Sequence, residues 1–174
     1  MIAGAVRIFE AEGFRGIGID RLIAPSGVST RTLYKHFGNR DGLVIAVLEA
    51  RHRAFMDQLA ASSGADPVAA LFDTLRAWID SHGSYGCMLL RARAEYASAC
   101  EPIVSLVHAQ KDEFREEIAR RVHTALGRED APLTTQLWLL FEGATAAASV
   151  AEGSVIDEAR DAALMLVGYA RTRA

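Results

Sequence analysis

The stretch GIDRLIAPSGVSTRTLYKHFGNRD, residues 18–41, decides the fold that we predict for this chain. Apolar residues recur with helical spacing over 19–24, and Gly27 follows where a tight turn favours a positive φ angle. Ser29 then opens a second helical pattern over 29–37, where its hydroxyl can accept a bond from an unpaired backbone N–H. Two short helices joined by a glycine turn form a helix-turn-helix, whose second helix enters the major groove of DNA.

The second helix of this motif carries basic side chains on its outer face. Arg31, Lys35 and His36 lie between Ser29 and Arg40, and no acidic residue interrupts that interval. Surface helices usually mix charges of both signs, so this basic face favours DNA contact over a merely solvated surface.

The individual contacts follow from the place of each residue on the helix. The first residues of a recognition helix lie nearest the base edges, so we assign sequence reading to Arg31 and Thr30, with Thr32 and His36 as further candidates. Lys35 and Arg40 are expected to hold phosphates; Tyr34 either does the same or packs at the edge of the module. The full set of candidate DNA contacts is Gly18, Ser29, Thr30, Arg31, Thr32, Tyr34, Lys35, His36 and Arg40.

Composition limits the other classes of function. The chain has 174 residues and a net charge of −3, but residues 1–60 hold eight Lys and Arg against six Asp and Glu. This asymmetry is typical of a DNA-facing N-terminal module on an acidic body. The two cysteines, Cys87 and Cys100, cannot form a zinc site alone, and no apolar run reaches the ~18 residues of a membrane span. We therefore expect a cytoplasmic protein with no metal, no cofactor and no membrane segment.

The remainder of the chain is helical by periodicity, and no alternation of period two is long enough for a strand. The predicted fold is all-α. It comprises a three-helix DNA-binding module at 1–45, a fourth helix to about 60 that connects, and a helical ligand-binding and dimerisation domain at 61–174. SSGAD at 62–66 is the predicted joint, and EGS at 152–154 is a further break. The helices predicted outside the helix-turn-helix are 1–12, 41–60, 67–81, 87–98, 102–126, 133–151 and 156–171.

The last two helices indicate an interface between copies of the chain. They carry few charges along one side and many small residues, which let another helix approach closely. Two such helices from each subunit would form a four-helix dimer interface. The residues predicted for it are Leu137, Ala144, Ala148, Ala159, Ala163, Leu166 and Val167.

The N-terminal part of the chain carries a pattern that extends across three helices and two turns: Phe9, Gly13, Phe14, Gly27, Val28, Ser29, Leu33, Tyr34, Phe37, Arg40, Asp41 and Leu43. In order and spacing, this pattern resembles that of the TetR/AcrR family of bacterial transcription regulators. The resemblance implies a homodimer that binds a pseudo-palindromic operator, a C-terminal cavity for a small-molecule effector, and most commonly repression. Gly18 departs from the family's usual Thr, as does Ile23 from Ala, Arg31 from a small residue and Arg40 from Lys.

The resemblance implies a ligand site in the C-terminal domain. For any single aromatic residue there, however, a place in the hydrophobic core is the simpler interpretation. Arg91 and Glu95 are four residues apart, so they can instead pair on a helix surface. Cys87 is either a redox or ligand-contacting thiol or a half-buried inert one; nothing basic is adjacent in sequence. The candidate ligand residues are Phe72, Trp78, Cys87, Met88, Arg91, Glu95, Trp138, Phe141 and Glu142.

Two other classes of function stay open at this point. An enzyme could use Cys87 with His82, but no orienting carboxylate or phosphate-binding glycine loop accompanies them, so we expect no enzyme. A helical interaction or ligand-binding protein with weakened DNA binding is the other alternative, and Gly18 and the short segment before the first helix favour it.

Overall fold

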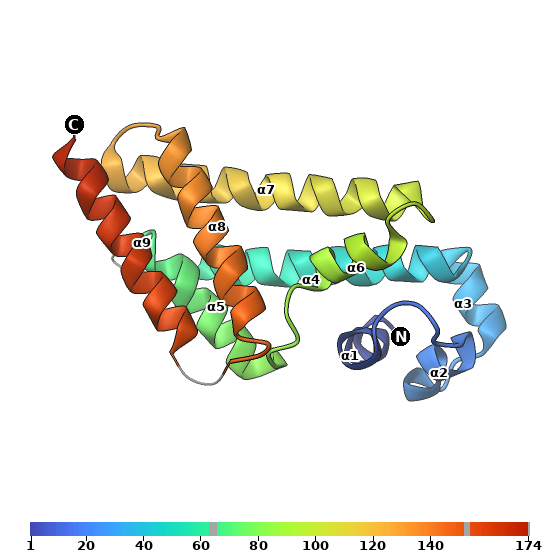
Figure 1. The fold of residues 1–174 in the computed structure, drawn as a ribbon. Coiled ribbons are helices and arrows are strands. Elements are labelled where there is room, and N and C mark those ends of the chain that lie inside the picture. The colour runs from blue at the N-terminus through green and yellow to red at the C-terminus, as the bar shows by residue number, and fades with distance from the viewer. Residues whose placement is uncertain (63–65, 152–153, 174) are drawn as a thin grey trace. The chain divides into compact units, whose positions relative to one another are not determined.

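The computed structural model describes residues 1–62, 66–151 and 154–173, and the regular elements in that part of the chain are helices (Figure 1). Residues 63–65 of the predicted joint and 152–153 of the predicted EGS break lie outside the described residues. The elements are α1 (Ile2–Glu12), α2 (Ile19–Ile23), the 3-10 turn η1 (Ala24–Ser26), α3 (Thr30–Phe37), α4 (Arg40–Ala61), α5 (Ala69–His82), α6 (Met88–Tyr96), α7 (Glu101–Leu126), α8 (Ala131–Ala147) and α9 (Val155–Thr172).

The predicted all-α fold is confirmed. Each predicted helix is present, and the largest difference in bounds is at α8, which ends at Ala147 instead of 151 because the following residues form a turn. No described helix is both long and apolar enough to cross a lipid bilayer.

Contacts divide the chain into two compact units. Unit 1 comprises Met1–Ala54 and Met88–Gln110, and unit 2 comprises Phe55–Cys87 and Lys111–Ala174. The sequence-based division at 61 differs from this, because α6 and the first part of α7 pack with the helix-turn-helix. Periodicity shows that a helix has an apolar face but not which core that face joins.

The core of unit 1 forms around α1 and the helix-turn-helix. Phe9 and Phe14 are fully buried with ring centroids 4.8 Å apart, and Leu33 of α3 is fully buried in the same cluster. Removing a side chain such as Leu33 from water stabilises the fold by about 1.5–3 kcal/mol. Ala92 and Tyr96 bring α6 into this core, so α3 is fixed from its inner side.

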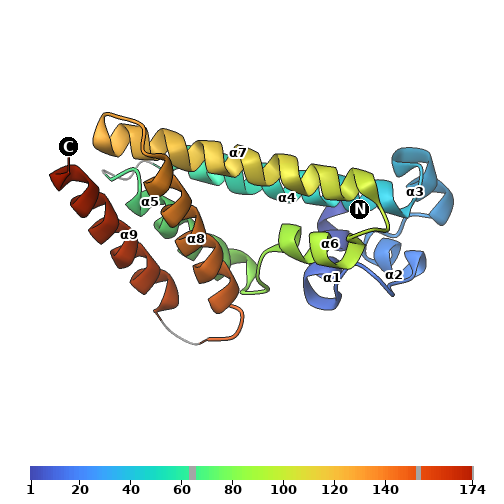
Figure 2. The ribbon, with the colours of Figure 1, turned by 45° about the horizontal axis from the view of Figure 1, so that its top comes forward.

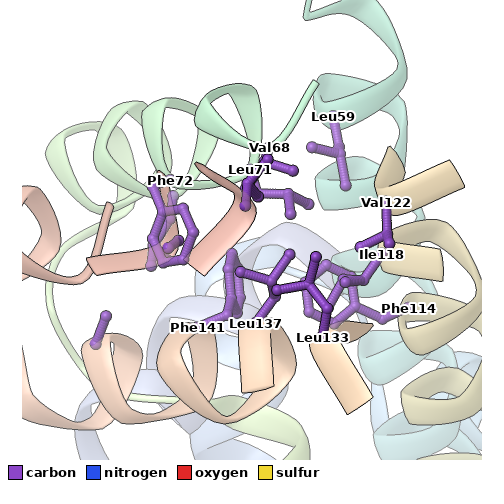
Figure 3. Packing of buried hydrophobic residues seen from close by; sticks show 14 of the residues in the cluster. Leu59, Val68, Leu71, Phe72, Phe114, Ile118, Val122, Leu133, Leu137 and Phe141 are labelled. Atoms are coloured by element: carbon purple, nitrogen blue, oxygen red, sulfur yellow. The ribbon is translucent and has the colours of Figure 1, made fainter. Parts of the chain in front are cut away.

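The core of unit 2 is a layer of aliphatic and aromatic side chains from α5, α7, α8 and α9. Figure 3 shows Phe114 and Phe141 in this layer, and their ring centroids are 4.6 Å apart. Helices α5, α8 and α9 pack against one another (Figure 1). Asp130 caps the start of α8, since its side chain accepts a hydrogen bond from the Leu133 N–H at 3.0 Å.

The residues predicted for a dimer interface belong to this core. Leu137, Ala144, Ala163 and Val167 are buried within unit 2 itself. Ala148, Ala159 and Leu166 are partly buried and pack against the same cluster. These side chains therefore face the core of unit 2. Sequence spacing did not reveal this, because α8 is apolar on more than one face and the spacing does not distinguish the faces.

Candidate nucleic-acid interface

The start of α3 is fixed by the cap and the turn that the sequence predicts. The Ser29 hydroxyl accepts a hydrogen bond from the Thr32 N–H at 3.2 Å, and its Oγ lies 3.0 Å from Thr32 Oγ1. Gly27 has a φ angle of 64°, the left-handed conformation that glycine adopts without strain. The cap and the buried Leu33 together hold the helix by its end and its inner face.

The outer face of α3 is exposed and basic. Four of its side chains are exposed: Arg31, Tyr34, Lys35 and His36. Helix α3 itself contains no acidic residue. Thr30 is half-buried and its hydroxyl donates to Asp20 Oδ1 of α2 at 3.4 Å. An exposed cationic helix face can reach both phosphates and base edges.

Arg40 differs from the phosphate contact expected for it. Its Nη1 donates to Tyr96 Oη at 2.7 Å, and its Nη2 donates to the backbone oxygen of Phe14. The guanidinium therefore makes its hydrogen bonds inside unit 1, where it links the start of α4 to α6 and to the turn that follows α1. Burial raises the pKa of Tyr96, and the Arg40 charge opposes that rise.

Gly18 begins α2 without a side-chain cap. Its φ of −69° and ψ of 152° are ordinary extended values, and a Cβ added there would meet no atom within 4 Å. The backbone at this position can therefore accept a larger residue. Helix α2 lacks a cap only because glycine has no side chain that could accept a hydrogen bond.

Arg91 and Glu95 of α6 grip the end of α1 and the turn after it. Glu95 Oε2 accepts hydrogen bonds from the Phe14 N–H at 2.9 Å and the Arg15 N–H at 2.7 Å. Arg91 Nη1 donates to the Glu10 carbonyl oxygen at 2.8 Å, and its Nε lies 3.3 Å from Glu95 Oε1. The predicted helix-surface pair is confirmed.

These partners give Arg91 and Glu95 a role other than ligand binding. Their polar groups satisfy backbone groups that α1 and its turn leave unpaired, as side chains commonly do at helix ends. Figure 2 shows α6 beside α1. Met88 is also part of unit 1, where it packs against the apolar cluster.

The remaining candidate ligand residues lie in unit 2, where most of the aromatic rings pack on one another. Phe72 and Phe141 are buried with centroids 6.0 Å apart. Trp78 stacks on His82 with centroids 4.0 Å apart, and His82 Nδ1 lies 2.9 Å from the Trp78 carbonyl oxygen. The core interpretation therefore holds for the phenylalanines.

A polar group interrupts this apolar unit where α7 faces α8. Lys111 Nζ donates to Glu142 Oε1 at 2.5 Å and to Cys87 Sγ at 3.3 Å. The pKa of Lys111 is raised overall. Burial alone would lower this pKa, but the interactions of the ammonium group with Cys87 and Glu142 have the larger combined effect. Along the same pair of helices, the Arg115 guanidinium lies 5.0 Å from the centre of the Trp138 ring.

The sequence analysis missed Lys111, although one signal could have found it. Lys111 continues the apolar series Val107, Phe114 and Ile118 along the buried side of α7. A cation in such a series requires an anionic partner, here Glu142. Among the described residues, Glu142 Oε2 and Trp138 Nε1 are buried without a hydrogen-bond partner, and no group of His, Cys, Asp and Glu there is arranged to hold a metal ion.

Comparisons with known proteins agree with this geometry. The model of bacterial regulatory proteins of the tetR family matches residues 1–47. A TetR-family transcriptional regulator from Streptomyces coelicolor superposes with a TM-score of 0.83 and 29% identity, over 99% of this chain and 92% of that one. A TetR transcriptional regulator from Chloroflexus aurantiacus gives 0.81 and 23%, over 96% and 91%. No curated protein matches the chain by sequence.

Proposed function

We propose that the chain is a ligand-responsive repressor of the TetR family, whose members bind DNA through a helix-turn-helix. The match of residues 1–47 to the tetR family model and the similarity of the fold to a TetR-family transcriptional regulator support this proposal. The chain binds a pseudo-palindromic operator as a homodimer in the bacterial cytoplasm, and a small-molecule effector releases it. The observation that carries the proposal is the exposed outer face of α3, whose charged residues are all basic, on a helix that the Ser29 cap holds at its end and the buried Leu33 holds at its inner face.

The proposed contacts divide by position on α3. Arg31, in the first turn, reads bases, since arginine can bond guanine through two donors, and Thr30 and Thr32 flank it. Lys35, one turn later, holds the DNA backbone together with Tyr34, and His36 stays a further candidate for base reading. Arg40 is left out of the contact set because its guanidinium is engaged with Tyr96 and Phe14.

Two matched variants test this division. A DNA fragment selected from a random library serves as the target, and fluorescence anisotropy follows binding against salt concentration. Arg31→Ala should cost about 1–3 kcal/mol and relax the preference at one base pair of each half-site. Lys35→Ala should weaken binding to all sequences equally and reduce the salt slope by about 1 for each protomer. Equal losses for both variants on selected and random DNA would contradict the assignment.

The dimer face that we propose lies on the outside of α8 and α9. Leu139, Met165 and Tyr169 are 58%, 70% and 61% exposed, large values for apolar side chains on two neighbouring helices. A second copy that packs its own α8 and α9 on this face would bury them. Met165→Glu should shift the protein to a monomer in sedimentation velocity, whereas Leu137→Ala should lower stability without affecting assembly.

The proposed effector site lies in unit 2, where α7 faces α8. Trp138 Nε1 offers a buried donor and Glu142 Oε2 a buried acceptor that the described residues leave unpaired. A ligand that satisfies both would gain affinity, because unpaired buried polar groups are costly. Release requires tighter binding to the DNA-incompetent state, and couplings of this kind are typically ~1–3 kcal/mol.

A further inference from the structure

Cys87 has a neighbour that its sequence context does not reveal. The Lys111 ammonium, on a different helix, donates to the Cys87 sulfur at 3.3 Å and to Glu142 Oε1 at 2.5 Å. The side chains of Lys111 and Glu142 are only 14% and 13% exposed, so solvent weakly screens this cluster. Cys87 itself is half-buried and forms no disulfide. A thiol, a cation and a carboxylate therefore meet at one place within unit 2.

This combination favours one kind of chemistry. Thiolates, not thiols, attack electrophiles, and a nearby cation stabilises the negative charge as it forms on sulfur. We propose that Cys87, together with Lys111 and Glu142, is a covalent sensing site for soft carbon electrophiles of the α,β-unsaturated carbonyl class. Only the consequence of this reaction, the release of DNA, rests on the proposed function.

The reaction is an addition that needs no further reagent. The Cys87 sulfur forms a bond to the β-carbon of the electrophile and loses its proton to solvent. The π electrons of the carbon–carbon double bond move toward the carbonyl group, and the α-carbon then takes up a proton from solvent. The net change is the addition of S–H across the double bond, with no oxidant and no leaving group. Lys111 keeps its proton and stabilises the sulfur charge before the bond forms.

The adduct has a direct path to the DNA-binding unit through the chain. Cys87 is joined by one peptide bond to Met88, the first residue of α6. Along α6, Arg91 and Glu95 hold the end of α1 and the turn that follows it. We expect a bulky thioether at half-buried Cys87 to displace its contact with Lys111 and to shift the segment that leads into α6. We expect the grip of α6 on α1 to loosen as a result.

Cys100 supplies an internal control for the labelling experiment. It is also a half-buried free thiol, but it lies in unit 1 after α6. The full chain is treated with one equivalent of N-ethylmaleimide at neutral pH, and peptide mass spectrometry follows each cysteine. Cys87 should react at least about tenfold faster than Cys100. Equal rates, or faster reaction at Cys100, would overturn the proposal.

Lys111 variants separate its charge from its packing. Lys111→Met should reduce the Cys87 rate by about tenfold, and Lys111→Arg should restore most of it because a cation is present again. The double variant Lys111→Met, Glu142→Leu removes both charges and remains informative if the single variant fails to fold. A Cys87 rate that is unchanged in a folded charge-free variant would contradict the role of Lys111.

The last measurement tests the coupling to α6 without any DNA. Hydrogen exchange of the labelled protein should increase over 88–96 and around Phe14, and Cys87→Ser treated in the same way should show no change. Labelling that leaves exchange in both segments unaltered would overturn the coupling. Because neither experiment contains DNA, a protein that reacts as described but binds no operator would count against the proposed function alone.

Discussion

Replacing Glu95 tests how α6 supports the DNA-binding module. The carboxylate accepts two backbone N–H bonds, a part-buried one from Phe14 at 2.9 Å and an exposed one from Arg15 at 2.7 Å. Leaving the Phe14 N–H unpaired costs about 1–3 kcal/mol, and the exposed bond adds about 0.5 kcal/mol. Glu95→Ala should therefore lower the free energy of unfolding of unit 1 by about 1.5–3.5 kcal/mol.

Two variants and two measurements make this prediction specific. Glu95→Gln keeps an acceptor oxygen without the charge and should lose only about 1 kcal/mol. Glu116→Ala removes an exposed carboxylate from α7 as a control. Urea denaturation followed by circular dichroism gives the stabilities, and NMR hydrogen exchange reports the Phe14 and Arg15 amides. If Glu95→Ala stays within about 0.5 kcal/mol of the control and both amides remain protected, the reasoning is refuted.

Three further predictions concern turns and caps. Gly18→Thr should raise stability by about 0.5–1 kcal/mol and tighten DNA binding, because the open extended backbone accepts a capping hydroxyl near the phosphates; a loss on thermal denaturation would contradict this. Gly27→Ala should lower the free energy of unfolding by about 1–2 kcal/mol. Its φ is 64° and an added Cβ would meet no atom within 4 Å, so the strain comes from the backbone conformation and not from a clash; an unchanged melting temperature would refute this prediction. The Leu133 N–H bond, with Arg128 adding to it, lowers the pKa of Asp130 from 3.8, so the cap stabilises the fold above that pH and the benefit is lost as pH falls through the folded pKa. Asp130→Ala should therefore cost about 1 kcal/mol at pH 7 and progressively less below pH 3.8 in urea titrations, with Asp130→Asn as the control that keeps the cap.

The helix-turn-helix could be predicted from sequence because its signals are local. The Ser29 cap, the positive φ of Gly27 and the buried Leu33 each depend on residues within one or two turns. Helical spacing likewise predicted the all-α fold. Short-range hydrogen bonds and backbone sterics decide such features, and the sequence states them directly.

What the sequence could not supply is which elements meet. Arg40 has the exposed pattern of a phosphate contact, yet Tyr96, 56 residues later, takes its guanidinium. Arg91 and Glu95 look like pocket residues, yet they pair with backbone groups some 80 residues earlier. Lys111 reaches Cys87 in the same way. Such partners depend on tertiary packing, which the spacing of residues along one helix does not contain.

The central claim is that this helix-turn-helix reads DNA sequence, and a competition experiment tests it most directly. The wild-type protein is titrated onto a labelled fragment from a random-library selection, at about 0.15 M salt and with a large excess of random DNA, while fluorescence anisotropy reports binding. The account predicts binding at least about 10³-fold tighter to the selected fragment than to random DNA, with two protomers on each site. Equal affinity for the two DNAs would contradict it.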